Sequence, residues 1–202
     1  MIKNIIFDFG DIFINLDKQG THKAMAALGV TEISEDMIYV YHQYEKGLIS
    51  TKEFINFYEL KFHLNREELV NAWNAVLLDF PKRRLDFIKE LSLRKKYRLF
   101  LLSNTNDLHI KWIQNSLGTE FYNEFKNAFE QFYLSHEIHF RKPDSEIYEF
   151  VLEQNNLNPF ETLFVDDLKE NTDSASNLGV QVWNLDPKTE DVTNLFTKNY
   201  SL

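Results

Sequence analysis

Short, continuous apolar runs alternate with amphipathic segments over most of this chain. The runs predict five strands, at residues 2–7, 98–102, 132–134, 162–165 and 180–183. Apolar residues near helical spacing predict four helices between them, at residues 85–95, 108–117, 145–154 and 171–178. Because the apolar runs do not alternate with polar residues, they are typical of parallel strands covered on both faces. The order predicts a doubly wound, Rossmann-like parallel α/β sheet.

The stretch from residue 15 to residue 82 has a different pattern, with several helix starts and no convincing strand. Ser50 and Glu53, for example, have the spacing of a capping box at the start of a helix. We therefore expect a small α-helical cap domain at residues 15–82, inserted into a core domain made of residues 1–14 and 83–202. The alternative is that these helices pack directly on the sheet.

Composition narrows the class of protein and its partners. The chain has 202 residues, a formal net charge of −9 and no cysteine, which excludes disulfides and thiol chemistry. The acidic balance argues against nucleic acid and anionic membranes as partners. No apolar run approaches membrane-spanning length, and the first residues lack a signal-peptide pattern. We expect a cytoplasmic protein, and no feature of the sequence predicts its oligomeric state.

Polar residues that could take part in catalysis or ligand binding follow the predicted strands. Asp8 ends the first apolar run, just before Gly10, where open α/β sheets place reactive groups. Such a carboxylate can attack phosphorus or carbon, or it can simply cap a turn. Ser103 and Asn104 follow the second run, where a hydroxyl and an amide can hold phosphoryl oxygens or form an ordinary turn. Lys142 precedes a predicted helix and is either a phosphate-binding cation or a solvated charge.

Asp166 and Asp167 follow the fourth run. Two adjacent carboxylates at a strand end repel each other unless a cation holds them. Mg²⁺ prefers a few carboxylates together with waters and substrate oxygens, so the pair suits this ion. The alternative is a loop that caps the next helix. All four signals fall at the same edge of the predicted sheet or open a helix there, so together they are more specific than any one alone.

In order and spacing, these motifs resemble those of the haloacid dehalogenase-like hydrolase superfamily, in particular its phosphatase branch with a helical cap inserted after the first motif. The resemblance is carried by four segments, Phe7-Asp8-Phe9-Gly10, Leu102-Ser103-Asn104, Arg141-Lys142-Pro143-Asp144 and Phe164-Val165-Asp166-Asp167. It implies that Asp8 is a nucleophile that becomes phosphorylated. It also implies that Ser103 and Asn104 bind the phosphoryl group, and that Lys142 stabilises this group and orients Asp8.

The resemblance further implies a Mg²⁺ site. Asp8, the backbone carbonyl of Gly10 and Asp166 would hold the ion, and Asp167 would contact it or its water shell. Gly10 is also a departure, because most phosphatases of the family have a second aspartate at this position as general acid and base. Asp11 is adjacent but points elsewhere. A missing general acid typically costs about 10²–10⁴ in rate, so we expect a preference for phosphates with activated leaving groups.

The sequence therefore favours a Mg²⁺-dependent phosphatase that hydrolyses a small phosphorylated metabolite, with sugar phosphates among the candidates. One alternative is a non-enzymatic member that binds a phosphorylated ligand or a partner, which Gly10 supports. Another is a metal-free 2-haloacid dehalogenase, which has no need for the aspartate pair. We expect Tyr44, Lys46 and Asn15 to contact the substrate from the cap. His109 follows the Ser103-Asn104 loop and is expected to be a solvated helix residue, the alternative being that it faces the cleft.

Overall fold

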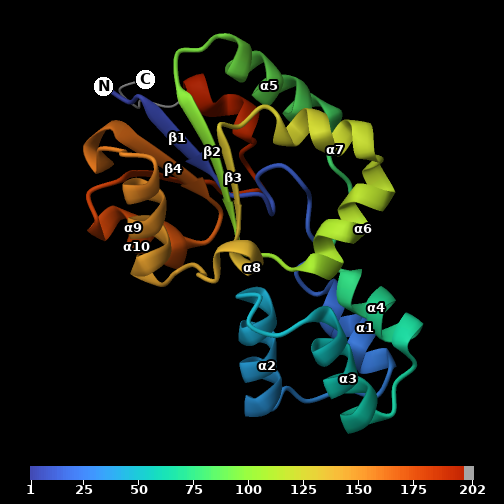
Figure 1. Ribbon diagram of the computed structural model, residues 1–202. Helices are drawn as coiled ribbons and strands as arrows, with labels where there is room; N and C mark the ends of the chain where they lie inside the picture. The colour runs from blue at the N-terminus through green and yellow to red at the C-terminus, as the bar shows by residue number, and fades with distance from the viewer. Residues whose placement is uncertain (198–202) are drawn as a thin grey trace.

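The computed structural model describes residues 1–197 and contains a five-stranded parallel sheet in the order β3-β2-β1-β4-β5 (Figure 1). Its strands are β1 (Asn4–Phe7), β2 (Arg98–Ser103), β3 (Gln131–Leu134), β4 (Thr162–Asp166) and β5 (Gln181–Asn184). All neighbouring strands pair in parallel. The predicted doubly wound fold is thus confirmed, and the strand order changes direction at β1, next to β4.

Both faces of the sheet are buried, which explains the continuous apolar runs. Ile5 and Phe7 of β1 pack into the core on one face, and Ile6 packs into a second core on the other. The first face is covered by α5 (Lys82–Leu93), α6 (Asp107–Leu117) and α7 (Thr119–Lys126). The second is covered by α9 (Ser145–Gln154) and α10 (Lys169–Asn177). Within residues 1–197, no helix combines the length and apolar character needed to cross a bilayer.

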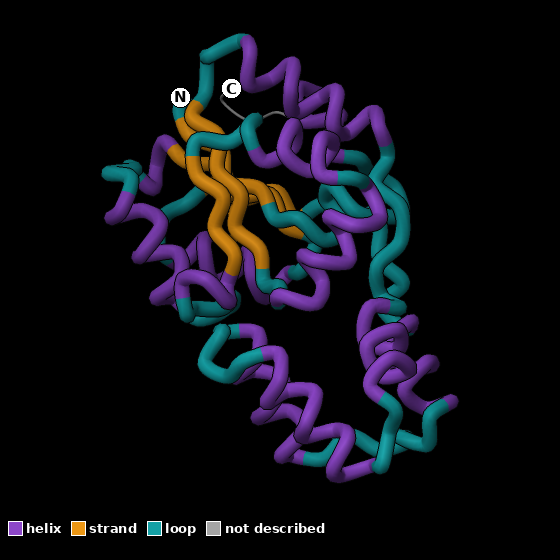
Figure 2. The backbone as a smooth tube through the Cα atoms, turned by 45° about the vertical axis from the view of Figure 1, so that its right-hand side comes forward, coloured by secondary structure: helices purple, strands orange, loops and turns teal. Residues whose placement is uncertain are grey.

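Four helices form a separate group beyond the carboxyl ends of the strands (Figures 1 and 2). They are α1 (Gly20–Ala27), α2 (Glu35–Glu45), α3 (Thr51–Phe62) and α4 (Arg66–Asn74). We call this group the cap helices. Their own aromatic core includes Phe54, whose ring centroid lies 4.2 Å from that of Tyr44 and 4.6 Å from that of Trp73. The predicted capping box of Ser50 and Glu53 starts α3.

The two chain segments that link the cap helices to the sheet lie side by side. The backbone N–H of Asn15 donates to the carbonyl of Asp79 at 2.9 Å, and the N–H of Leu78 donates to the carbonyl of Asn15 at 3.0 Å. Asp17 donates to Val76 at 2.9 Å. We call this pairing the linker ladder. It brings the start of the inserted segment within a few residues of Asp8.

The cap helices also contact the sheet domain at the end of α2 and the start of α3. The hydroxyl of Ser135, at the start of the short helix α8 (Ser135–Ile138), donates to the carbonyl of Glu45 at 2.7 Å. Thr51 Oγ1 donates to Asp107 at 2.8 Å. These contacts place the last turn of α2 over the carboxyl ends of β2 and β3.

Candidate active site

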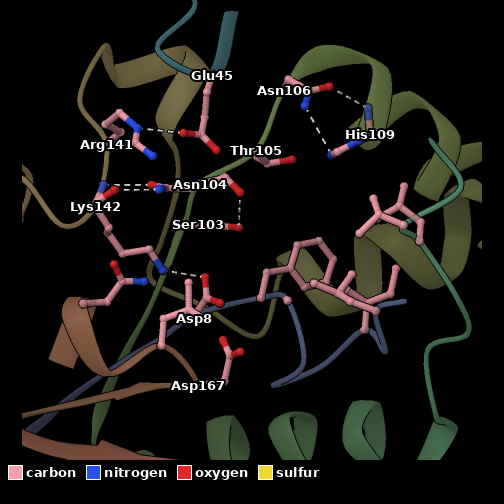
Figure 3. A pocket seen from close by; sticks show the side chains of 18 of the residues that line it. Asp8, Glu45, Ser103, Asn104, Thr105, Asn106, His109, Arg141, Lys142 and Asp167 are labelled. Carbon is pink, nitrogen blue, oxygen red and sulfur yellow. Dashed lines mark hydrogen bonds and ion pairs between the residues drawn. The ribbon is translucent and has the colours of Figure 1, made fainter. Parts of the chain in front are cut away.

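The sheet brings the predicted residues together at one edge. Asp8 directly follows β1, and its N–H donates to Val165 of β4 at 2.9 Å, so the next residue of β4, Asp166, lies beside it. Ser103 is the last residue of β2, on the other side of β1. A pocket of about 400 Å³ opens over these strand ends (Figure 3). It is lined by Asp8, Gly10, Ser103, Asn104, Lys142 and Asp167, among others.

Lys142 connects the two strand-end carboxylates. Its Nζ lies 2.6 Å from Asp8 Oδ1 and 2.7 Å from Asp166 Oδ2, and its side chain is 1% exposed. Burial alone would lower the pKa of Lys142, but Asp166 and Asp8 raise it above its usual value. Burial, with Asp166 adding to it and Lys142 opposing it, raises the pKa of Asp8 to about 7. The lysine is therefore a fixed positive charge beside Asp8.

The two polar residues at the end of β2, Ser103 and Asn104, differ in their contacts. Ser103 is buried, and its hydroxyl makes one long contact, 3.4 Å, to the carbonyl of Asn104. This leaves the hydroxyl able to contact a ligand in the pocket. The side chain of Asn104 forms hydrogen bonds with the main chain of Lys142. Asn104 thus fixes the loop that carries Lys142, a role that its position in the sequence did not reveal.

Three carboxylates could hold a metal ion. One oxygen from each of Asp8, Asp166 and Asp167 lies within 4.8 Å of the others. Hard oxygen donors of this kind suit Mg²⁺. Asp166 is fully buried and accepts hydrogen bonds from Lys142, Asn171 and the N–H of Leu168. Asp167 instead lines the pocket, so the two neighbours have different surroundings.

The loop after Asp8 places Gly10 close to Leu16, and Asp11 close to Lys18. A Cβ at Gly10 would lie 2.8 Å from Leu16 Cδ1, and the Gly10 carbonyl accepts from Ile12 at 2.6 Å. Asp11 has a φ of 54°, and its side chain accepts from the N–H of Leu16 at 3.0 Å. Its other oxygen lies 3.2 Å from Lys18 Nζ. Asp11 does not line the pocket, in keeping with the expectation that it points elsewhere.

The cap residues proposed from the sequence do not line the pocket. Tyr44 is buried in the aromatic core of the cap helices, Lys46 pairs with Asp144 at 3.1 Å, and Asn15 donates to Asp79 at 3.0 Å. The pocket is lined instead by Lys18, Tyr41 and Glu45. Tyr41 lies within one helical turn of both Tyr44 and Glu45 on α2, so helical spacing alone does not show which of these residues face the pocket.

His109 is not the solvated residue that we expected. It lines the pocket, and its ring stacks on Trp73 of α4 with centroids 5.8 Å apart. Burial lowers the pKa of His109 to about 4, so the ring is neutral near pH 7. Asn106 Oδ1 accepts from the N–H of His109 at 3.1 Å and caps α6. This three-residue capping spacing was visible in the sequence, but the packing of the ring against α4 was not.

Comparison with known proteins gives consistent matches over nearly the whole chain. The family model described as haloacid dehalogenase-like hydrolase matches residues 5–185. D-ribitol-5-phosphate phosphatase from Bacteroides thetaiotaomicron is 34% identical over 196 residues, covering 91% of each protein. A crystal structure of an HAD family enzyme from the same organism, in complex with magnesium and inorganic phosphate, is 34% identical with a TM-score of 0.81 and covers 97% of this chain and 100% of that chain.

A structure of a predicted HAD-like family hydrolase from Porphyromonas gingivalis is similar to the same extent in fold. It is 28% identical, with a TM-score of 0.81, and covers 98% of this chain and 100% of that chain. The shared fold therefore includes the cap helices as well as the sheet.

Proposed function

The chain belongs to the haloacid dehalogenase-like hydrolase family, and we propose that it is a Mg²⁺-dependent phosphatase of small phosphorylated metabolites, sugar and polyol phosphates among them. The observation that carries the proposal is Lys142, which bridges Asp8 and Asp166 at the floor of the pocket. The comparisons support it, since one relative is named a phosphatase and one similar structure contains magnesium and inorganic phosphate. A pocket of about 400 Å³ suits a small substrate.

In this proposal, Asp8 is the nucleophile. A carboxylate oxygen of Asp8 forms a bond to phosphorus while the bond from phosphorus to the leaving oxygen breaks, and that oxygen gains a proton. Water then attacks phosphorus in the aspartyl-phosphate, which releases inorganic phosphate and restores the Asp8 carboxylate. Lys142 and the Ser103 hydroxyl would stabilise charge on the phosphoryl oxygens through both steps.

The donor set fits a magnesium ion held by Asp8, the Gly10 carbonyl and Asp167. When bound, the ion would neutralise phosphoryl charge and orient the phosphate. We assign the direct contact to Asp167 rather than to Asp166, the reverse of the assignment made from the sequence, because Asp167 lines the pocket. Both oxygens of Asp166 already accept hydrogen bonds from buried groups, including Lys142. Asp166 would therefore act by fixing Lys142.

Gly10 has no side chain that could donate a proton to the leaving group. The sequence predicts a preference for activated leaving groups, which need little protonation. D-ribitol 5-phosphate, the substrate in the name of one relative, is a primary alkyl phosphate with a poor leaving group. A substrate series must therefore include both kinds, and equal or faster turnover of alkyl phosphates would contradict the predicted preference.

The test is phosphate release from acyl, aryl, sugar-1-, sugar-6- and polyol phosphates, with Mg²⁺ or with a chelator. We expect release that requires Mg²⁺ and that falls by about 10⁴-fold or more in Asp8→Asn, since the nucleophile is lost. Asp173→Asn on the exposed face of α10 is the control, because Asp173 pairs there with Lys169 and neither residue lines the pocket.

Two other results would contradict the proposal and favour a different function. Stabilisation by phosphorylated ligands without turnover above Asp8→Asn would indicate a binding protein. Chloride release from a 2-haloacid in chelator would indicate a dehalogenase.

A further inference from the structure

The end of the pocket opposite the strand-end aspartates contains an ion pair that the proposed chemistry does not use. Arg141 Nε lies 2.7 Å from Glu45 Oε2, and the Tyr41 hydroxyl donates to Glu45 Oε1 at 2.6 Å. All three residues line the pocket that contains Asp8. In Figure 3, Arg141 and Glu45 lie at one end of the pocket and Asp8 and Asp167 at the other, with Ser103 and Asn104 between them.

This pair is built into the protein rather than lying on its surface. Glu45 is 4% exposed, and it lies in the last turn of α2, which Ser135 anchors through the Glu45 carbonyl. Burying an ion pair is costly, and apolar residues of similar size often stabilise a protein as well. Stability alone is therefore a weak explanation for this ion pair. Its position on the pocket wall indicates a role in ligand binding instead.

The pair retains hydrogen-bonding capacity. Among residues 1–197, Arg141 makes its hydrogen bond through Nε, and its two terminal nitrogens form no hydrogen bond with another protein group. Each oxygen of Glu45 accepts one hydrogen bond from a side chain and has a further lone pair. The pocket wall thus presents hydrogen-bond donors of Arg141 and acceptors of Glu45 side by side.

We propose that Arg141 and Glu45 bind distal hydroxyl groups of the leaving group, and so select phosphorylated polyols or sugars with several carbons. This inference rests on the proposed phosphatase function. A hydroxyl is both donor and acceptor, so it can accept from Arg141 and donate to Glu45. Because Glu45 neutralises Arg141, the pair favours a neutral polar group over a second phosphate or a carboxylate.

The length of the required leaving group follows from chain connectivity. Arg141 directly precedes Lys142, whose side chain reaches from the backbone to Asp8. A leaving group must therefore extend from phosphorus for at least about the length of a lysine side chain to touch the pair. A polyol of four or five carbons has this reach, and acetyl phosphate does not.

The experiment compares kcat/KM for D-ribitol 5-phosphate with kcat/KM for acetyl phosphate. We expect Arg141→Gln to lower the ratio of the two values by roughly 10- to 100-fold, the effect of losing a charged hydrogen bond. Arg66→Gln, which breaks the exposed cap pair with Glu59, is the matched control and leaves the ratio at its wild-type value. An equal loss on both substrates would overturn the proposal, since Arg141 would then act through Lys142 or the cap contact.

A second variant keeps the test decisive if Arg141→Gln folds poorly. Glu45→Gln preserves size but leaves Arg141 without its neutralising partner. We expect this variant to lose kcat/KM on D-ribitol 5-phosphate and to gain at least about threefold on 6-phosphogluconate, whose far end is a carboxylate. No gain on the acid together with an unchanged polyol ratio would overturn the inference. Failure of the proposed function is distinct, because the wild-type protein would then release phosphate from none of these substrates.

Discussion

The side chain of Asn104 forms hydrogen bonds with both polar main-chain groups of Lys142. Asn104 Oδ1 accepts from the Lys142 N–H at 2.8 Å, and Asn104 Nδ2 donates to the Lys142 carbonyl at 2.8 Å. The loop after β2 thereby fixes the residue whose Nζ contacts Asp8. The sequence suggested that the Asn104 side chain binds the phosphoryl group, whereas its amide is engaged with the backbone.

Asn104→Ala is expected to lower kcat more than it raises KM, because Lys142 loses its position beside Asp8. Two main-chain groups would also lose partners, at a cost of about 1–3 kcal/mol each if they stay buried. The measurements are steady-state kinetics and urea unfolding. Asn65→Ala is the matched control, since Asn65 accepts two backbone N–H groups at the start of α4, away from the pocket. It should cost about 1 kcal/mol with no change in kcat, and an equal kcat loss in both variants would contradict the positioning role.

Mg²⁺ is expected to stabilise the folded protein, because the three carboxylates that could bind it lie close together only in the folded state. At a Mg²⁺ concentration of 100 times Kd, the free energy of unfolding should rise by about 2.7 kcal/mol. Urea unfolding with Mg²⁺ or with chelator at constant ionic strength measures this difference. Asp167→Asn should remove most of it, whereas Asp173→Asn should not. A full Mg²⁺ effect in Asp167→Asn would contradict the assignment of Asp167 as a ligand.

Gly47→Ala is expected to disturb the contact between the cap helices and α8. Gly47 has a φ of 65°, and a Cβ there would lie 2.0 Å from the carbonyl oxygen of His136. The left-handed conformation costs roughly 1–2 kcal/mol for a residue with a Cβ, and the clash adds to it and shifts α2. We expect a lower free energy of unfolding and a higher KM.

The control for this variant is Gly29→Ala. Gly29 also has a positive φ, of 90°, but a Cβ there would meet no atom within 4 Å. It isolates the conformational cost from the clash. Equal losses in the two variants would show that the contact with His136 is not tight.

His109 gives a pH dependence of stability with a defined sign. Its pKa is lowered from 6.5 to about 4 in the folded protein, chiefly by burial. Between these values the unfolded chain binds the proton more tightly, so this contribution to stability is present above pH 6.5 and is lost as the pH falls toward 4. The full effect is on the order of 3 kcal/mol. Unfolding of wild type and His109→Gln at pH 7 and at pH 4.5 measures it as a difference.

Comparing wild type with His109→Gln separates the contribution of His109 from that of other titrating groups. The stability advantage of wild type over His109→Gln should shrink at the lower pH, and His22→Gln on the exposed face of α1 should show no such change. An advantage that is constant with pH would contradict the neutral state of the partly buried His109.

The sequence predicted the sheet well because its signals are local. Each apolar run such as Ile5-Ile6-Phe7 is buried on both faces, and polar residues at parallel strand ends must meet at one edge. The position of Asp8 beside Asp166 therefore followed from topology. The helix α7 was missed, and it begins directly after Gly118, with no separate capping side chain.

Residues whose roles depend on side-chain direction could not be predicted in this way. Tyr44 and Glu45 are neighbours, yet one packs inside the cap helices and the other faces the pocket. The choice depends on which face of α2 meets α3, a long-range property. Likewise, nothing local distinguishes an Asn104 that binds substrate from one that binds the main chain of Lys142, 38 residues away.

The linker ladder has a mechanical consequence. If the two linker segments were independent, the cap helices could twist and slide relative to the sheet. The hydrogen bonds of Asn15 with Asp79 and Leu78 instead join the two segments into one ribbon. A ribbon bends mainly about a single axis, so we expect any opening of the cap helices to follow one principal direction. Because Asp11 accepts from Leu16 within this ribbon, bending it also pulls on the loop that follows Asp8. We therefore expect opening of the pocket and relaxation of the loop after Asp8 to be coupled.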